Sequence, residues 1–286
     1  YGNTLINFAE KISLTSFPFA SGISGNMKQM KRRILNIASY ERPGLQKKLK
    51  SITAFLMISV LLLGLTPFVS TYAADKNHYP WNASSKNCSE IDFTNYFGKY
   101  EGSFVLYDLK KDTWKIHDME RATLRIAPDS TYKIYNALFG LEKDIITPEN
   151  SFIKWNGTTY PFETWNKDQI LSSAMSASVN WYFGYIDEQL GKTSVQEYLH
   201  KIGYGNKDLS GNFSSYWMES SLKISPIEQV ELLTRLQNQN LGFASENVKA
   251  VKDTIHISSS SFGDCYGKTG TGRVNGKDIN GWFIGF

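Results

Sequence analysis

The chain has 286 residues, 41% of them hydrophobic and 14% aromatic, so it can bury a sizeable core and is not intrinsically disordered. The formal net charge of +4 hides an uneven distribution, because residues 1–50 carry nine basic and two acidic residues whereas the remainder carries 22 basic and 25 acidic ones. Since the basic segment directly precedes a long apolar run, it favours a membrane surface and argues against nucleic acid as a partner.

Residues 51–74 form an uncharged, largely apolar stretch of 24 residues. As a helix it would extend about 36 Å, enough to cross a hydrocarbon layer of about 30 Å. Three lysines precede the stretch closely and only Lys76 follows it, so the positive-inside rule predicts residues 1–50 in the cytoplasm and everything after Ala74 outside. A cleaved signal peptide and a buried core helix are the alternatives, and the long preceding segment argues against the first.

Residues 75–90 are polar and rich in Asn, Ser and Lys, which predicts a short extracellular linker. Apolar residues then alternate over residues 102–109 and again around Trp114 and Ile116, on either side of a Lys-Lys-Asp turn. This alternation is typical of a β-hairpin.

The middle of the chain carries helical spacing, and strand character returns near its end. Helices are predicted over residues 131–141, 169–190 and 194–202, a capping box with proline at the first helical position begins at Ser225, and strands are predicted over residues 266–270 and 280–286. Strands at both ends with helices between them predict one α+β domain over residues 91–286. Its antiparallel sheet would be flanked by helices and would pair early strands with late ones.

A serine and a lysine three residues apart, Ser130 and Lys133, open one of the predicted helices. At that spacing both side chains lie on one helix face, so the amine can reach the hydroxyl and take its proton. A neutral amine near pH 7 requires the lysine pKa to fall by about 3 units, which burial can achieve. The same spacing occurs at Ser151 and at Ser220, and a solvated helix face is the simpler interpretation of each pair taken alone.

The order of motifs that follows distinguishes Ser130 from the other two serines. Ser178-Val179-Asn180, Tyr204-Gly205-Asn206 and Lys268-Thr269-Gly270-Thr271-Gly272 come after it in turn. In this order they match the pattern of penicillin-recognising serine enzymes. Each motif alone would also fit an ordinary turn or strand edge. For Tyr204-Gly205-Asn206, a turn that positions the site and a direct ligand contact both stay open.

With these motifs, residues 91–286 resemble the penicillin-binding sensor domain of the sensor-transducers of methicillin resistance and penicillinase induction, and the methicillin-resistance member most closely. That domain is itself similar to class D β-lactamases, so the resemblance implies a penicillin-recognising serine transferase fold. The stretches that support it outside the motifs are Trp165-Asn166-Lys167-Asp168, residues 181–183, residues 215–219 and 221–225, and Gly281-Trp282-Phe283.

The resemblance implies a role for each matching residue. Ser130 is the expected nucleophile, Lys133 the base that takes its proton, and Ser178 the relay that passes a proton to the leaving nitrogen. Lys268 would offer a cation to the β-lactam carboxylate, and Trp217 would form a pocket wall. The complete set expected to contact the ligand is Asn180, Trp217, Lys268, Thr269 and Thr271.

Asn180 is the residue that separates a sensor from a hydrolase. Class D β-lactamases carry valine at this position, and their apolar wall protects a lysine carbamate that activates the deacylating water. The asparagine amide can instead hydrogen-bond the lysine without carbon dioxide, so the acyl-serine is expected to persist. Penicillin-binding transpeptidases also have asparagine here, so Asn180 indicates slow hydrolysis rather than signalling in particular.

The resemblance further implies a cell-membrane receptor in which an N-terminal zinc protease precedes the last transmembrane helix, and in which acylation outside the cell leads to removal of a repressor of resistance genes. The expected partners are β-lactam antibiotics, membrane lipid, the cytoplasmic protease domain of the same receptor and, indirectly, the repressor. Residues 1–50 are interpreted as a remnant of the protease domain.

No metal ligand set is recognisable in the sequence, because the four histidines fall singly and the two cysteines form no CxxC motif. No cofactor is therefore expected apart from a carbamate that carbon dioxide could form on Lys133, and zinc is expected only in the protease domain. Sensor domains of this kind continue past a strand matching residues 281–286. The C-terminal truncation is expected to expose apolar sheet surface.

Two other functions remain open at this point. One is a membrane-tethered class D β-lactamase that hydrolyses its substrate. The other is a catalytically silent binding module that kept the fold. The lifetime of the acylated serine distinguishes them from a sensor.

Overall fold

The computed structural model describes residues 77–286 together with Gly44. The chain divides into two compact units, Tyr1–Thr71 and Tyr72–Phe286, and the described elements all belong to the second. The transmembrane helix predicted over residues 51–74 and nearly all of the cytoplasmic segment lie outside the described residues. Among the helices that are described, none is both long and apolar enough to cross a bilayer.

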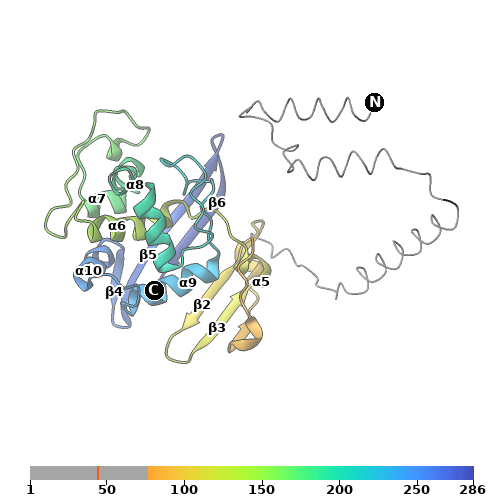
Figure 1. Ribbon diagram of the computed structural model, residues 1–286. Coiled ribbons are helices and arrows are strands. Elements are labelled where there is room, and N and C mark those ends of the chain that lie inside the picture. The colour runs from red at the N-terminus through yellow and green to blue at the C-terminus, as the bar shows by residue number, and fades with distance from the viewer. Residues whose placement is uncertain (1–43, 45–76) are drawn as a thin grey trace. The chain divides into compact units, whose positions relative to one another are not determined.

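Most strands lie near the two ends of the described chain, and most helices lie between them (Figure 1). In chain order they are η1 (Ala83–Ser85), β1 (Cys88–Glu90), α4 (Thr94–Phe97), β2 (Phe104–Asp108), β3 (Thr113–His117), α5 (Met119–Thr123), η2 (Asp129–Tyr132), α6 (Lys133–Glu142), η3 (Glu163–Trp165), α7 (Leu171–Ser176), α8 (Asn180–Ile202), α9 (Pro226–Gln237), α10 (Ser245–Thr254), β4 (His256–Ser260), β5 (Gly263–Val274) and β6 (Lys277–Gly285). The predicted α+β class and the hairpin formed by β2 and β3 are confirmed.

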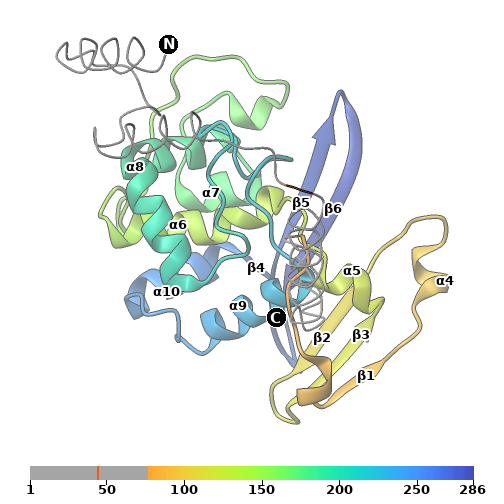
Figure 2. The ribbon, with the colours of Figure 1, turned by 45° about the vertical axis from the view of Figure 1, so that its right-hand side comes forward.

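The strands form two separate three-stranded sheets rather than the single sheet expected. The first has the order β1-β3-β2 and the second β4-β5-β6, so within the described residues early strands do not pair with late ones. The first sheet is also not wholly antiparallel, because β1 runs parallel to β3. The views in Figures 1 and 2 place it on the opposite side of β5 and β6 from helices α6, α8 and α10.

A small apolar cluster explains why the first sheet stays apart from the second. Trp114 and Ile116, on one face of β3, are buried against Ala122 of α5 and Ile227 of α9. Helix α9 also contacts β6, so a helix joins the two sheets where a strand pairing was expected. The apolar face of a strand has to be covered by other elements. Here helices cover this face of β3, so it is buried although the first sheet does not join the second.

The large core surrounds helix α6, whose residues 133–141 are all buried. They pack chiefly against α8, then against α10, and also against the adjoining turn η2. The cluster is unusually aromatic and includes the fully buried rings of Tyr132, Tyr216 and Trp217. The element that begins at Lys133 is thus surrounded by protein, and a polar group placed on it is kept from water.

The helix predicted over residues 169–190 is broken. Helix α7 ends at Ser176 and α8 begins at Asn180, because Ser178 adopts a left-handed backbone with φ 51°. The backbone there is held by hydrogen bonds from the Ser178 N–H to the Met175 carbonyl and from the Val179 N–H to the Ala174 carbonyl. Such a conformation costs about 1–3 kcal/mol for a residue other than glycine, and it is concentrated at functional sites.

Residues 77–90, expected within a linker spanning residues 75–90, are folded onto the domain. The Tyr79 N–H donates to the Thr123 carbonyl, and the Tyr79 hydroxyl donates to Glu231 at 2.9 Å. Trp81 packs edge-on against Trp114 with ring centroids 5.2 Å apart. The polar composition of the segment concealed two aromatic side chains that are partly buried against the domain.

The capping box predicted at Ser225 is present at the start of α9, and it yields a test of the fold. The buried Ser225 Oγ accepts from the Glu228 N–H and donates to its carboxylate, which also accepts from the Ser225 N–H. We expect Ser225→Ala to lower the free energy of unfolding by about 1–2 kcal/mol. Urea denaturation of the full chain in detergent measures this loss. Ser245→Ala, in the first turn of α10 where no side-chain cap is formed, is the control and should change stability little.

Candidate active site

The turn η2 and the first turn of α6 bring Ser130 and Lys133 together. The Lys133 Nζ lies 2.6 Å from the Ser130 Oγ, which is hydrogen-bonding distance. Lys133 has no exposed surface, whereas Ser130 is partly exposed. A serine that can be reached from solvent thus stands directly against an amine that cannot, and this is the geometry of a nucleophile and its base.

Burial favours the neutral form of the Lys133 amine. Burial lowers the lysine pKa well below its usual range, and the positive charge of Lys268 lowers it further, while the Asp129 carboxylate acts in the opposite sense. The Nζ donates to the Asn180 Oδ1 at 2.7 Å and lies 4.5 Å from the centre of the Trp217 ring. An amine made neutral by burial can accept the hydroxyl proton of Ser130, and these two contacts can then hold the ammonium that forms.

A second lysine–serine pair lies beside the first. Strand β5 carries Lys268, whose Nζ donates to the Ser178 Oγ at 2.5 Å and to the Thr269 carbonyl at 3.0 Å. Burial lowers the pKa of Lys268 to about 8, so this lysine is still mainly charged at pH 7. Ser178 makes this contact from a left-handed backbone. The two lysines therefore favour different protonation states although they serve the same cavity.

The close approach of β5 to the nucleophile depends on a glycine. A Cβ on Gly270 would lie 3.1 Å from the Pro128 carbonyl oxygen and 3.3 Å from the Ser130 backbone nitrogen. Any larger side chain would push the strand away from η2. Glycine at this position therefore lets Lys268 and Thr271 flank the same cavity as Ser130.

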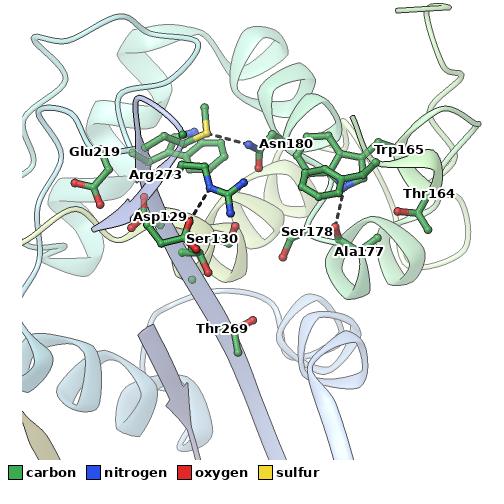
Figure 3. Close-up of a pocket in the computed structure, with 17 residues that line it drawn as sticks. Asp129, Ser130, Thr164, Trp165, Ala177, Ser178, Asn180, Glu219, Thr269 and Arg273 are labelled. Atoms are coloured by element: carbon green, nitrogen blue, oxygen red, sulfur yellow. Dashed lines mark hydrogen bonds and ion pairs between the residues drawn. The ribbon is translucent and has the colours of Figure 1, made fainter. Parts of the chain in front are cut away.

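A cavity of about 730 Å³ opens where these elements meet (Figure 3). It brings together the residues predicted from the sequence, because six of them line it and the two lysines are hydrogen-bonded to its lining. Those six are Ser130, Ser178, Asn180, Trp217, Thr269 and Thr271. Residues that the sequence did not single out for the site also line it, among them Asp129, Phe162, Trp165, Glu219 and Arg273. For Asp129 the available signal was its position directly before the serine.

The Tyr204-Gly205-Asn206 motif acts as a turn that braces the site. The Asn206 Oδ1 accepts from the backbone N–H groups of Lys223 and Asp208, and its Nδ2 donates to the Ser221 carbonyl at 2.8 Å. Asn206 is not among the residues that line the cavity. Of the two roles left open by the sequence, the geometry favours the bracing turn.

The two other serine–lysine spacings lie away from the cavity. The Ser151 Oγ accepts from the Leu171 N–H, and neither Ser151 nor Ser220 lines the cavity. Their lysines, Lys154 and Lys223, do not line it either. The spacing alone therefore did not identify the site, and the accompanying motifs did.

Comparison with known proteins places this geometry among penicillin-binding proteins. A family model described as penicillin binding protein transpeptidase domain matches residues 102–286. The regulatory protein BlaR1 of Bacillus licheniformis is 37% identical over 289 residues, which cover 100% of this chain and 48% of the relative. The methicillin resistance mecR1 protein of Staphylococcus aureus is 34% identical over 290 residues, with the same coverage of 100% and 48%.

Among solved structures, the C-terminal domain of the Bacillus licheniformis BlaR penicillin-receptor is similar with a TM-score of 0.67 and 41% identity, over 70% of this chain and 82% of that one. The chain spans about half the length of the curated relatives it matches, 48% in each case. Identity to BlaR1, at 37%, exceeds identity to mecR1, at 34%. The expectation that the chain most closely resembles the methicillin-resistance member is therefore wrong.

The bracing turn provides a test of how the site is held. We expect Asn206→Ala to lower the free energy of unfolding by about 2–3 kcal/mol, because it leaves backbone groups of Lys223, Asp208 and Ser221 without their partner. Urea denaturation measures the change. The matched control is Asn238→Ala at the exposed end of α9, and an equal loss in both variants would contradict a bracing role.

Proposed function

The chain belongs to the penicillin-binding protein transpeptidase family, and from its site we propose that it is the β-lactam-sensing part of a signal-transducing receptor. In this proposal a β-lactam antibiotic acylates Ser130, and the ester persists instead of turning over. The observation that carries the proposal is the contact of one buried amine, Lys133 Nζ, with both the Ser130 hydroxyl and the Asn180 amide oxygen.

Acylation begins with the removal of a proton from Ser130. The neutral Lys133 amine takes the hydroxyl proton as the oxygen attacks the lactam carbonyl, and the amine becomes an ammonium. Attack opens the strained ring by breaking the bond between the carbonyl carbon and the nitrogen. The lowered pKa of Lys133 supports this step, because an amine of ordinary pKa would already be protonated at pH 7.

The leaving nitrogen and the substrate carboxylate are served by the second lysine pair. Ser178 is placed to pass its hydroxyl proton to the nitrogen and to take one in return from the charged Lys268 amine, to which it is hydrogen-bonded. Lys133 then keeps the proton that it took from Ser130. The charge on Lys268 and the hydroxyls of Thr269 and Thr271 offer donors to a carboxylate bound in the cavity. A ligand that carries both a lactam and a nearby carboxylate matches the two halves of the site.

Persistence of the ester follows from what holds the lysine after acylation. The ammonium formed on Lys133 can donate to the Asn180 Oδ1 and lies 4.5 Å from the centre of the Trp217 ring, which favours the charged form. An ammonium has no lone pair with which to activate water. Extending a lifetime from about a hundredth of a second to about a thousand seconds requires roughly 7 kcal/mol, and loss of the base can supply much of it.

A carbamate on Lys133 fits this arrangement poorly. The Asn180 Oδ1 accepts a hydrogen bond from Nζ, and the Nδ2 of the same amide donates to the Met218 sulfur at 3.0 Å. A carbamylated Nζ would keep one N–H for Oδ1, but its charged oxygens would find no donor on Asn180, whose Nδ2 is already bonded to Met218, in a buried position. We therefore propose that the free amine, and not a carbamate, is the working base. This favours a sensor over the alternative of a membrane-tethered class D β-lactamase.

The receptor setting belongs to the proposal as well. We propose that residues 51–74 cross the cell membrane, that the domain lies outside, and that acylation is signalled to a cytoplasmic zinc protease domain of the same receptor, which acts on a repressor of resistance genes. The names of the relatives, a regulatory protein and a methicillin resistance protein, support this setting.

One experiment tests the proposal against both alternatives. The full chain in detergent is mixed with benzylpenicillin, and the protein mass and the free antibiotic are followed together. We expect a single adduct per chain, stable for many minutes and absent from Ser130→Ala. Ser151→Ala and Ser220→Ala, which change the other serine–lysine spacings, are the controls and should still form the adduct. Rapid loss of antibiotic without a lasting adduct would indicate a hydrolase, and no reaction at all would indicate a silent module.

The role of Asn180 can be tested separately. We expect Asn180→Val to speed deacylation by tenfold or more, because an apolar wall no longer holds the protonated lysine and would allow a carbamate to form on it. Release of the adduct is measured by mass with and without added bicarbonate. An adduct lifetime equal to that of the unchanged chain would remove Asn180 as the reason for persistence.

A further inference from the structure

Two carboxylates meet beside the nucleophile, and the acylation chemistry assigns no role to either. Asp129 directly precedes Ser130, and Glu219 lies in the loop that carries Trp217 and Met218. A Cβ on Gly272 of β5 would overlap the Glu219 Oε1 and lie 2.9 Å from the Asp129 Oδ2, so both oxygens occupy the space beside this glycine. Figure 3 shows both side chains at the same end of the cavity.

The environment of this pair does not suit two negative charges. Asp129 is only 2% exposed, and the Glu219 Oε1 is buried without a hydrogen-bond partner. The Asp129 carboxylate accepts from a neutral amide, the Asn280 Nδ2, at 3.2 Å and from the backbone N–H of Glu219, both of them uncharged donors. Both acidic residues also adopt left-handed backbones, with φ 48° and 43°, a strain that the surrounding structure must offset. Two carboxylates this close together, with uncharged hydrogen-bond donors, cannot both be ionised without a cost in free energy.

We propose that Asp129 and Glu219 share one proton, and that this shared proton ties the turn bearing Ser130 to the loop bearing Trp217 and Met218, making both acids positioning residues for acylation. The inference rests on the proposed function for its chemical consequence. The inference that the proton is shared depends only on the geometry of the pair.

The contacts around the pair show what such a tie would position. The Asp129 N–H donates to the Trp217 carbonyl at 3.0 Å, so the two segments already meet through the backbone. On the loop, Trp217 lies over the Lys133 amine, and the Met218 sulfur accepts from the Asn180 Nδ2. When the proton is lost, repulsion between the two carboxylates would open this junction and move the groups that hold Lys133.

Other ionisable groups also face the pair and must be taken into account. Lys133 of α6 interacts with Asp129 across the site, and Tyr204 does so from the turn after α8. Arg273 of β5 lines the same cavity, but its guanidinium is paired with Asp278 of β6 at 2.6 Å. Burial and the charge of Glu219 together raise the pKa of Asp129 to about 7. The shared proton would thus be lost close to neutral pH.

Stability provides a test that needs no antibiotic. If folded Asp129 keeps a proton that the unfolded chain releases near pH 4, stability must fall as pH rises from about 5 to 7. Over this window, we expect the unfolding equilibrium constant of the unchanged chain, divided by that of Asp129→Asn, to rise about tenfold per pH unit. Glu219→Gln is a second variant with the same expectation. The exposed Asp253→Asn is the control and should keep the pH dependence of the unchanged chain. Parallel curves for the unchanged chain and both pair variants would overturn the shared proton.

Acylation provides the test of positioning. Asp129→Asn keeps a donor towards Glu219 at every pH, so its junction should not open. The rate of adduct formation with benzylpenicillin in the unchanged chain, divided by that in Asp129→Asn, should fall about fivefold between pH 7 and pH 8, because the protonated fraction of a group of pKa about 7 falls from about a half to about a tenth. A constant ratio would overturn the positioning role. If no variant is acylated, the proposed function fails, and the stability measurement still decides whether the proton is shared.

Discussion

The contact on which the whole site depends is that of the Lys133 amine with the Ser130 hydroxyl in a place that water does not reach. Burial of α6 along nearly its entire length creates this condition, since the amine could not stay neutral on an exposed helix. The aromatic core therefore does more than stabilise the fold. It lowers the pKa of the amine that is proposed to activate the serine, so packing and chemistry cannot be varied independently here.

The two lysines illustrate how one cavity can favour a neutral amine and a charged amine side by side. Lys133 is wholly enclosed and lies near Lys268, and both effects favour its neutral form. Lys268 is also largely buried, but its pKa falls only to about 8, so it keeps its charge at neutral pH. The proposed acylation uses one lysine that can accept a proton and another that can attract a carboxylate. Their different degrees of enclosure provide this division.

Much of the site could be predicted from the sequence, because its motifs are short and each carries its chemistry locally. Ser130 and Lys133 are one helical turn apart, and the Lys268-Thr269-Gly270 segment has the alternation of a strand. What depends on distant contacts could not be predicted in this way. The separation of the two sheets follows from the burial of Trp114 against Ile227, 113 positions further along the chain. The meeting of Asp129 with Glu219 likewise depends on tertiary packing and leaves no periodic signal in the sequence.

The interruption of α8 at Gly191 has a mechanical consequence. Asn180 is the first residue of this helix, and the backbone leaves helical geometry at Gly191, where φ is 72° and ψ is 155°. The ladder of helical hydrogen bonds that fixes Asn180 is therefore confined to the segment before Gly191, and residues 192–202 form a second helical segment beyond the kink.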